Sequence, residues 1–196
     1  MIFETQRGQA IPTLVQVAGE KRKLDRRARR RHGLVTFVLS FLITILSGAM
    51  ILLLFLPVLE VSGSSMEPTL QDGDILVLLK KGAVETGEMC GMYANGRLIL
   101  KRVIGLPGDV VRMDEAGNVY VNDIQLAEPY VSTKTLGNCD LSFPYTVPED
   151  SLFVLGDHRE TSIDSRSDLI GCVNVNQVMG HVVARIWPPQ SIGWVG

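Results

Sequence analysis

The chain has 196 residues, of which 46% are hydrophobic and 20% are charged, and its 19 Lys and Arg residues nearly balance 21 Asp and Glu residues. This composition excludes collagen-like, low-complexity and wholly disordered chains, and the length allows one domain of ordinary size with an appendage. The charge is unevenly distributed, because residues 1–33 carry nine basic and three acidic side chains whereas the remaining residues carry ten and eighteen. A basic segment therefore precedes an acidic one.

Residues 33–59 contain no charged side chain. About 20 apolar residues in a helix cross a hydrocarbon core of ~30 Å, so this run is long enough to span a bilayer once. It is too long for the apolar core of a typical signal peptide, and its apolar character on every face disfavours the alternative of a buried helix in a soluble core. We predict a basic tail at residues 1–33, a transmembrane helix at 34–59 and an external domain at 60–196.

The block KRKLDRRARRR directly before the apolar run predicts the orientation. Lysines and arginines close to the end of a spanning helix are retained on the cytoplasmic side. We therefore expect a single-pass protein of the cell membrane with a cytoplasmic amino terminus and an extracytoplasmic domain. A nucleic-acid-binding arm is the alternative interpretation of the block, but next to a spanning helix contact with anionic lipid is favoured and no nucleic-acid partner is expected. Residues 1–20 carry no chemical motif and are expected to be disordered.

The external part is expected to be mostly β, as a compact, barrel-like domain. Short β-branched or alternating segments are separated by turn signals such as Asn95-Gly and Pro107-Gly-Asp. Many short, closely spaced strands are typical of barrels and sandwiches. The segments that we expect to form strands are residues 74–79, 97–104, 110–113, 119–121 and 182–187.

Three cysteines, Cys90, Cys139 and Cys172, fall in the external part. An oxidising location permits one disulfide, for which Cys139 and Cys172 are the preferred pair, and buried free thiols are the alternative. The chain has three histidines and no Cys-x-x-Cys pair, so no metal site is expected.

Three stretches of the external part carry residues suited to catalysis. In Val61-Ser-Gly-Ser-Ser-Met-Glu-Pro, small residues let a serine hydroxyl and backbone amides approach a substrate. In residues 97–109, strand alternation places Lys101 on one face with Ile99 and Val103. A lysine among aliphatic side chains loses hydration, which lowers its pKa and can make it a neutral base, although an exposed lysine is the commoner outcome.

The third stretch, Gly156-Asp-His-Arg-Glu-Thr-Ser-Ile-Asp-Ser-Arg166, is dense in charge directly after an apolar segment. Its charged side chains could pair with one another and hold the loop in place, and Ser162 could form a hydrogen bond with a neighbouring amine. A solvated loop is the alternative interpretation of this stretch.

Taken together, the three stretches resemble bacterial type I signal peptidases, membrane-anchored serine proteases with a serine and lysine dyad. The similarity covers the anchor and nearly all of residues 58–187. It is carried by Gly63-Ser-Ser-Met-Glu-Pro-Thr-Leu, Lys101-Arg-Val-Ile-Gly-Leu-Pro-Gly-Asp and the stretch from Gly156 to Arg166. Three motifs in the family's order beside an anchor make the resemblance specific.

The resemblance implies a role for each matching residue. Ser65 would be the nucleophile and Lys101 the general base, Ser162 would orient the lysine amine, and Gly63 would stand at a position that supports the oxyanion hole. The positions that shape and brace the site match Asp157, Arg159, Asp164 and Arg166. No cofactor is implied. The implied partners are secretory preproteins cut after an Ala-x-Ala type site, the lipid bilayer and the secretion translocon.

One departure from the family pattern is His158, which stands where Asn is usual. A histidine near a serine and carboxylates leaves open a triad of Ser65, His158 and an aspartate. Two further alternatives are an anchored β module without enzymatic activity and a self-cleaving repressor with a serine and lysine dyad. The last would require a soluble DNA-binding domain where this chain has an apolar span.

The position of Ser65 suggests where the site works. An extended chain covers at most ~3.6 Å per residue, so Ser65 lies within about 25 Å of Leu59 at the end of the predicted span. We therefore expect substrates that are still tethered in the same membrane. Met66 and the region of Trp187 and Trp194 are expected to contact either lipid or the protein core.

Overall fold

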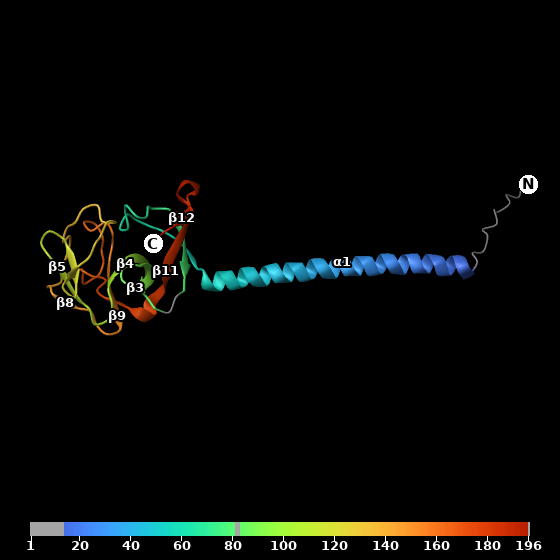
Figure 1. Cartoon of the computed structure of the whole chain (residues 1–196), viewed down its shortest axis with the longest axis horizontal. Coiled ribbons are helices and arrows are strands. Elements are labelled where there is room, and N and C mark those ends of the chain that lie inside the picture. Colours follow the sequence, from blue (N-terminus) through green and yellow to red (C-terminus); the bar gives the residue numbers. More distant parts are fainter. Residues whose placement is uncertain (1–13, 81–82, 196) are drawn as a thin grey trace, which may run out of the picture. The chain divides into compact units, whose positions relative to one another are not determined.

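The computed structural model describes residues 14–80 and 83–195, with the backbone alone at residues 14–28, 53 and 55. The chain divides into two compact units whose boundary lies between Leu52 and Leu53. A helix forms the first unit and β-sheets form the second (Figure 1). This is the mostly β fold class with one amino-terminal apolar helix that the sequence predicts.

The helix α1 (Leu14–Phe55) begins inside the basic segment. Its first turns contain Lys, Arg, Glu, Ala and Leu, which have high helix propensity, so the expectation of disorder is wrong for residues 14–20. Residues 1–13, for which disorder was also expected, lie outside the described residues. The helix ends at Phe55 rather than at residue 59, because Pro57 has no N–H to donate and disfavours the helical conformation of the residue before it.

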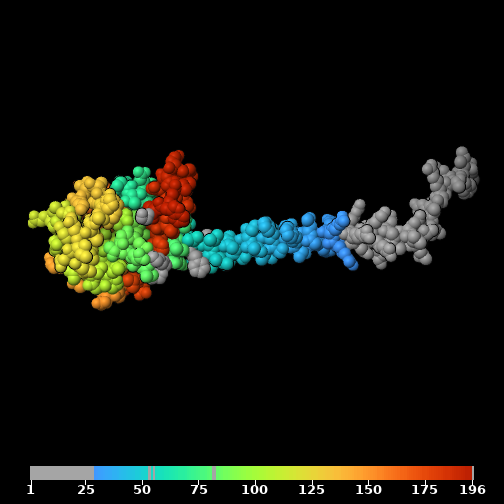
Figure 2. Space-filling model, viewed as in Figure 1, coloured from blue at the N-terminus to red at the C-terminus, as the bar shows by residue number. Residues whose placement is uncertain are grey.

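Within α1, the stretch Arg29–Leu52 is long and apolar enough to cross a membrane. In Figure 2, the visible face of this stretch is formed by its own side chains, and none of the span is buried inside the protein. Four hydroxyl groups in the apolar run donate to helix carbonyls three or four residues earlier, those of Thr36, Ser40, Thr44 and Ser47. This local pairing lets hydroxyl side chains lie in hydrocarbon without an unsatisfied donor.

The second unit contains a sheet of eight strands and a sheet of four. The larger sheet has the order β1-β2-β11-β3-β4-β9-β10, with β12 paired to β11, and the smaller has the order β7-β6-β5-β8. The strands of the larger sheet are β1 (Val58–Glu60), β2 (Ile75–Leu79), β3 (Met89–Ala94), β4 (Arg97–Gly105), β9 (Ser151–Leu155), β10 (Val173–Asn174), β11 (Val178–Trp187) and β12 (Gly193–Trp194). Those of the smaller are β5 (Val110–Met113), β6 (Val119–Val121), β7 (Ile124–Gln125) and β8 (Tyr145–Thr146). Two short 3-10 helices, Val175–Gln177 and Pro189–Ser191, flank β11.

Strand β4 has a central place in the larger sheet. It pairs with β3 on one side, where Lys101 lies opposite Cys90, and with β9 on the other, where Arg102 lies opposite Leu155. Figure 1 shows β3, β4 and β9 close together in this unit. The strand that carries the lysine motif is thus hydrogen-bonded to the strand that leads into the charged loop at Gly156.

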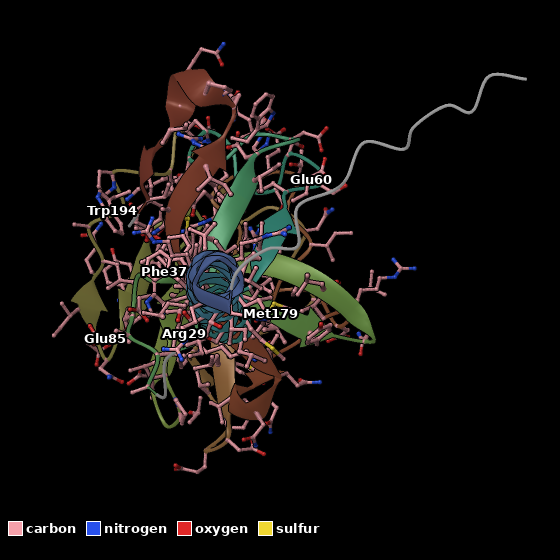
Figure 3. All side chains as sticks on the ribbon, turned by 90° about the vertical axis from the view of Figure 1, so that its right-hand side faces the viewer. Arg29, Phe37, Glu60, Glu85, Met179 and Trp194 are labelled. Carbon is pink, nitrogen blue, oxygen red and sulfur yellow. The ribbon has the colours of Figure 1, made fainter. Side chains whose placement is uncertain are left out.

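The turn after β1 is anchored in a hydrophobic cluster. Met66 and Leu70 are 1% and 0% exposed and pack with Leu76 and Leu78 of β2. Met66 therefore belongs to the core and does not contact lipid. Trp187 and Trp194 are 51% and 86% exposed, and Trp194 is labelled in Figure 3.

Cys139 and Cys172 are both free in the structure. Cys90 is buried in the sheet, and the preferred disulfide between Cys139 and Cys172 is not formed. The Cys172 thiol instead lies 3.8 Å from the Tyr145 hydroxyl, and burial raises the pKa of this thiol. The alternative of free thiols is the one that the structure supports.

Candidate active site

Ser65 lies in a hydrogen-bonded turn between β1 and β2. The Glu67 N–H donates to the Ser64 carbonyl at 3.1 Å, and the Leu70 N–H donates to the Met66 carbonyl at 2.9 Å. Gly63 enters the turn with φ +90°, a value that strains any side chain other than glycine. Small residues thus allow the bend, and the buried side chains that follow hold it against the sheet.

The polar atoms of Ser65 are available to a substrate. Its side chain is partly exposed, and within the described part of the chain neither its hydroxyl nor its N–H donates a hydrogen bond. The N–H of Gly63, two residues earlier, donates to the Asp72 carboxylate at 2.7 Å. The Ser65 amide is therefore free to bind a negatively charged oxygen, whereas the Gly63 amide is already used.

Lys101 is buried on β4, and so are all four residues that follow it in the strand, so strand alternation alone does not account for its burial. It is 4% exposed and forms no salt bridge with any residue of the described ranges. Loss of hydration on burial lowers the pKa of Lys101 from 10.5 to about 8, and the positive charge of Arg166 acts in the same direction. The carboxylates of Asp164 and Asp157 act against this shift. A sizeable fraction of the amine is therefore neutral near physiological pH.

Ser65 and Lys101 face the same cavity. It has a volume of ≈ 570 Å³, and its lining includes Ser62, Gly63 and Ser64 beside the two residues. A smaller cavity of ≈ 240 Å³ on the side of Val61 and Leu100 is also lined by both Ser65 and Lys101. The structure thus brings together the two residues that the sequence singled out, although it contains no hydrogen bond between their side chains.

The charged loop after β9 is held by buried ion pairs. Arg166 pairs with Asp164 at 2.8 Å, and all atoms of both side chains are buried. Asp157 pairs with Arg102 at 2.7 Å and accepts a hydrogen bond from the Thr69 hydroxyl at 2.6 Å. The Asp157 carboxylate therefore fixes the loop both to β4 and to the turn of Ser65. The loop is thus not a solvated connection.

Arg159 pairs with a residue from outside the three motifs. Its guanidinium contacts the Glu128 carboxylate at 2.5 Å, and both side chains are 0% exposed. The same guanidinium donates to the Gly156 carbonyl at 3.0 Å. Two of the loop's charged residues thus have partners elsewhere in the chain, whereas only Asp164 and Arg166 pair within the loop.

The Ser162 hydroxyl is buried without a hydrogen-bond partner among the described residues. It lies beside Gly156, where an added Cβ would overlap the Ser162 Oγ and would stand 2.5 Å from the Ser65 carbonyl oxygen. The hydrogen bond to the lysine amine that the family resemblance implies is not formed in this conformation. An unpartnered buried hydroxyl next to the backbone of Ser65 nevertheless leaves this residue free to accept one.

His158 lies beside the turn of Ser65 but outside the cavity that Lys101 lines. Its ring Nδ1 is 3.3 Å from the Ser64 carbonyl, and its N–H donates to the Ser65 carbonyl at 3.1 Å. The ring lines a different cavity with Glu67 and Gln71. Neither neighbouring aspartate bonds to the ring, because Asp157 and Asp164 bind arginines, so the geometry does not support a Ser-His-Asp triad.

Sequence reasoning missed four residues that surround the site. They are Thr69, Arg102, Glu128 and Tyr130. The Tyr130 ring lies 3.8 Å from the Arg102 guanidinium carbon, and burial raises its pKa to about 12, so the phenol stays neutral. Glu128 and Tyr130 lie in the irregular connection after β7, where no periodic pattern marks a buried side chain.

No group of three or more His, Cys, Asp or Glu side chains in the described ranges is placed to hold a metal ion. A partly exposed serine and a buried lysine of lowered pKa on one cavity of a mostly β unit are the parts of a serine and lysine hydrolase site. A pair of this kind can perform the chemistry of a serine hydrolase without a histidine base.

Comparison with known proteins narrows this class to one family. The family model described as "Signal peptidase, peptidase S26" matches residues 34–187. The chain therefore belongs to the signal peptidase family, peptidase S26. It is 32% identical to signal peptidase I of Bacillus licheniformis over 190 residues, which is 86% of this chain and 96% of that protein.

Two further relatives match parts of the chain. A probable signal peptidase I-2 of Synechocystis sp. is 37% identical over 145 residues, which is 68% of this chain and 64% of that protein. The match thus spans just under two thirds of the Synechocystis protein's length. A crystal structure of a signal peptidase I from Enterococcus faecalis is 30% identical and matches 52% of this chain and 98% of that one, with a TM-score of 0.42.

Proposed function

We propose that this protein is a membrane-anchored serine endopeptidase that removes signal peptides from secretory preproteins, with Ser65 as nucleophile and Lys101 as general base. The observation that carries the proposal is the position of a partly exposed serine and a buried, ion-pair-free lysine on one cavity. Because burial lowers the pKa of Lys101 to about 8, the amine can accept a proton near neutral pH.

The proposed chemistry is acyl transfer in two steps. The neutral Lys101 amine takes the proton of the Ser65 hydroxyl while the oxygen attacks the peptide carbonyl, and the resulting ammonium then protonates the departing amine. This leaves an ester between Ser65 and the signal peptide's carboxyl end. The same lysine deprotonates a water molecule that attacks the ester, and the resulting ammonium then returns the proton to the serine oxygen as the ester bond breaks.

The Ser65 amide is suited to stabilise the tetrahedral intermediate. An oxyanion donor of this kind typically contributes ~3 to 4 kcal/mol to the stability of the transition state. The Ser65 N–H is free for this role, whereas the Gly63 N–H is held by Asp72. Gly63 would then contribute through its φ of +90°, a backbone conformation that lets the chain bend with no side chain beside Ser65.

The substrate class follows from the cavity and the anchor. Around Ser65 the cavity is lined by aliphatic side chains, namely Ile99, Ile163, Leu169 and Ile170. Apolar walls of this kind suit the small residues of an Ala-x-Ala type cleavage site. Only nine residues separate the end of α1 at Phe55 from Ser65, so the chemistry takes place within reach of the membrane and of preproteins that leave the secretion translocon.

The proposal is tested with the full chain in detergent and a labelled preprotein. Ser65→Ala removes the nucleophile and Lys101→Met replaces the amine by an unbranched side chain of similar length, so each should lower the cleavage rate by about 10⁴-fold. Matched controls are Ser142→Ala and Lys80→Ala, which change exposed residues and should leave the rate unchanged. Cleavage by the Ser65→Ala protein at the normal rate would refute the assignment.

A further inference from the structure

His158 holds two consecutive carbonyl groups of the turn that carries Ser65. Its backbone N–H donates to the Ser65 carbonyl at 3.1 Å, and its ring Nδ1 lies 3.3 Å from the Ser64 carbonyl oxygen. A carbonyl oxygen can only accept, so the ring nitrogen that faces it carries the proton. The Ser64 carbonyl also accepts from the Glu67 N–H at 3.1 Å and is thus held from two directions.

This contact determines the direction of the Ser65 N–H. The peptide unit between Ser64 and Ser65 is planar and trans, so its carbonyl and its N–H point in opposite directions. If the carbonyl is fixed toward His158 and Glu67, the N–H is fixed away from them. This N–H has no acceptor among the described residues and is the proposed oxyanion donor.

We propose that His158 is a positioning residue that holds the Ser64–Ser65 peptide unit with its N–H aimed at the developing oxyanion. The inference rests on the proposed function, since it assumes that Ser65 is the nucleophile. The ring is not a catalytic residue, because it lines a separate cavity with Glu67 and Gln71 whereas Ser65 faces Lys101 across another. The ring acts on the reaction only through the backbone of the turn.

The role requires a donor at one atomic position, not an imidazole. The Asn side-chain nitrogen is attached to Cγ as the His Nδ1 is, so asparagine can donate to the same carbonyl. Ionised aspartate has nearly the same shape as asparagine but can only accept, and it would repel the Ser64 carbonyl oxygen. Leucine fills the space without any polar group. The three substitutions therefore separate hydrogen-bond donation from shape.

The experiment measures kcat and KM of the full chain in detergent with a peptide substrate, for His158→Asn, His158→Asp and His158→Leu. We expect the Asn variant to keep kcat within about threefold, and the Asp and Leu variants to lose about 10-fold to 100-fold in kcat with KM nearly unchanged. This loss is smaller than that for a deleted oxyanion donor, because the N–H is still present but is less well aimed. His181→Leu, in β11 and on a different cavity, is the matched control and should not change kcat.

Two further readouts distinguish a positioning role of His158 from a general loss of folded structure. The pH at which kcat/KM reaches half its plateau should stay the same in the Asn and Leu variants, because neither of them adds a charge near Lys101. Inhibition by a peptide aldehyde, which forms a tetrahedral adduct, should weaken in parallel with kcat. Rates are divided by the concentration of acylated enzyme in the initial burst, so a partly unfolded variant is still compared per active molecule.

The outcomes distinguish this inference from the proposed function. A Leu variant with wild-type kcat, or an Asn variant as slow as the Asp variant, would overturn the role of His158 while a dead Ser65→Ala protein still supported the nucleophile. An active Ser65→Ala protein would instead remove the basis of both. If the Leu variant does not fold, the Asn and Asp pair decides, since the two side chains differ by one donor group.

Discussion

At the scale of single residues, the site depends on the cost of burying one amine. Lys101 is 4% exposed but has no carboxylate partner among the described residues, where Asp157 and Asp164 are each bound to an arginine. A lysine without a partner responds to burial by releasing its proton, since the neutral amine is less costly to desolvate than the ammonium. The buried ion pairs around the site thus occupy the carboxylates that would otherwise keep Lys101 charged.

This arrangement predicts how activity depends on pH. Because only the neutral amine acts as a base, kcat/KM should rise with pH and approach a plateau above the pKa of Lys101, which lies at about 8. Below that pH it should fall tenfold per unit, so that at pH 6 about 1% of the enzyme carries a neutral lysine. The measurement is a pH profile of kcat/KM with a peptide that has no titrating group in this range.

A second variant checks the cause of the profile. The Asp164 carboxylate raises the pKa of Lys101, so Asp164→Asn, which keeps the shape of the side chain, should move the midpoint to lower pH. Glu115→Gln removes an exposed carboxylate at the tip of the β5–β6 hairpin and should leave the midpoint in place. A rate that stays constant between pH 6 and pH 9 would show that Lys101 does not act as the base.

At the scale of elements, Gly156, which follows β9, lies against both the turn of Ser65 and Ser162 of the charged loop. A Cβ added at Gly156 would lie 2.5 Å from the Ser65 carbonyl oxygen and 2.5 Å from the Ser162 Cβ, closer than non-bonded atoms approach. The absence of a side chain here lets the turn of Ser65 and the charged loop meet. The Asp164 carboxylate, which accepts from the Gly156 N–H at 3.0 Å, fixes the same backbone.

Gly156→Ala should therefore displace the turn of Ser65. A shift of about 1 Å at a reacting group can cost about 100-fold in rate, so we expect a loss of this size in kcat, together with a decrease of about 1–3 kcal/mol in the free energy of unfolding. Enzyme kinetics and urea unfolding measure the two effects. Gly193→Ala is the control, because a Cβ at Gly193 has no atom within 4 Å. Wild-type kcat in the Gly156→Ala protein would mean that the close contact does not position the serine.

The elements also show what the sequence can predict. Strands β5 and β6 were located correctly because β-branched residues alternate between turn signals. Strand β3, with the sequence MCGMYA, was missed because Met, Cys, Gly and Ala carry little strand propensity, and it is a strand because its neighbours β4 and β11 pair with it. Strand β9 is buried at every position and thus lacks the alternation by which strands are recognised.

The site shows the same difference between what local sequence patterns predict and what tertiary contacts determine. The roles of Ser65 and Lys101 stay predictions that rest on the family motifs in which they stand, and the structure adds that both residues line one cavity. Arg159 and Glu128 are 31 residues apart, and nothing local marks Glu128 as the partner of a buried arginine. The contacts of His158 with the turn of Ser65 likewise depend on segments more than 90 residues apart. Tertiary pairings of this kind follow from the folded sheet and leave no trace in the local pattern.

At the scale of the whole molecule, the chain combines a basic helical segment, an apolar span and an acidic sheet unit. The span Arg29–Leu52 begins with three consecutive arginines, whereas the first charged residues after it are Glu60, Glu67 and Asp72. The insertion of a membrane helix responds to Lys and Arg near its ends, and acidic residues contribute little. The proposed function requires the sheet unit to lie outside, where preproteins emerge from the membrane.

This charge pattern predicts the topology and a way to disturb it. In spheroplasts, an external protease should digest a tag at the carboxyl terminus and spare a tag at the amino terminus. Replacing the eight Lys and Arg residues between positions 21 and 31 with Gln should yield a mixture of orientations, because no excess of Lys and Arg then marks the cytoplasmic side. Replacing Glu20 and Asp25 with Gln and Asn changes the net charge by a smaller amount and leaves every Lys and Arg in place, so the orientation should be retained. Protection of the carboxyl-terminal tag in the unaltered protein would place the sheet unit in the cytoplasm, away from the preproteins that Ser65 is proposed to cleave.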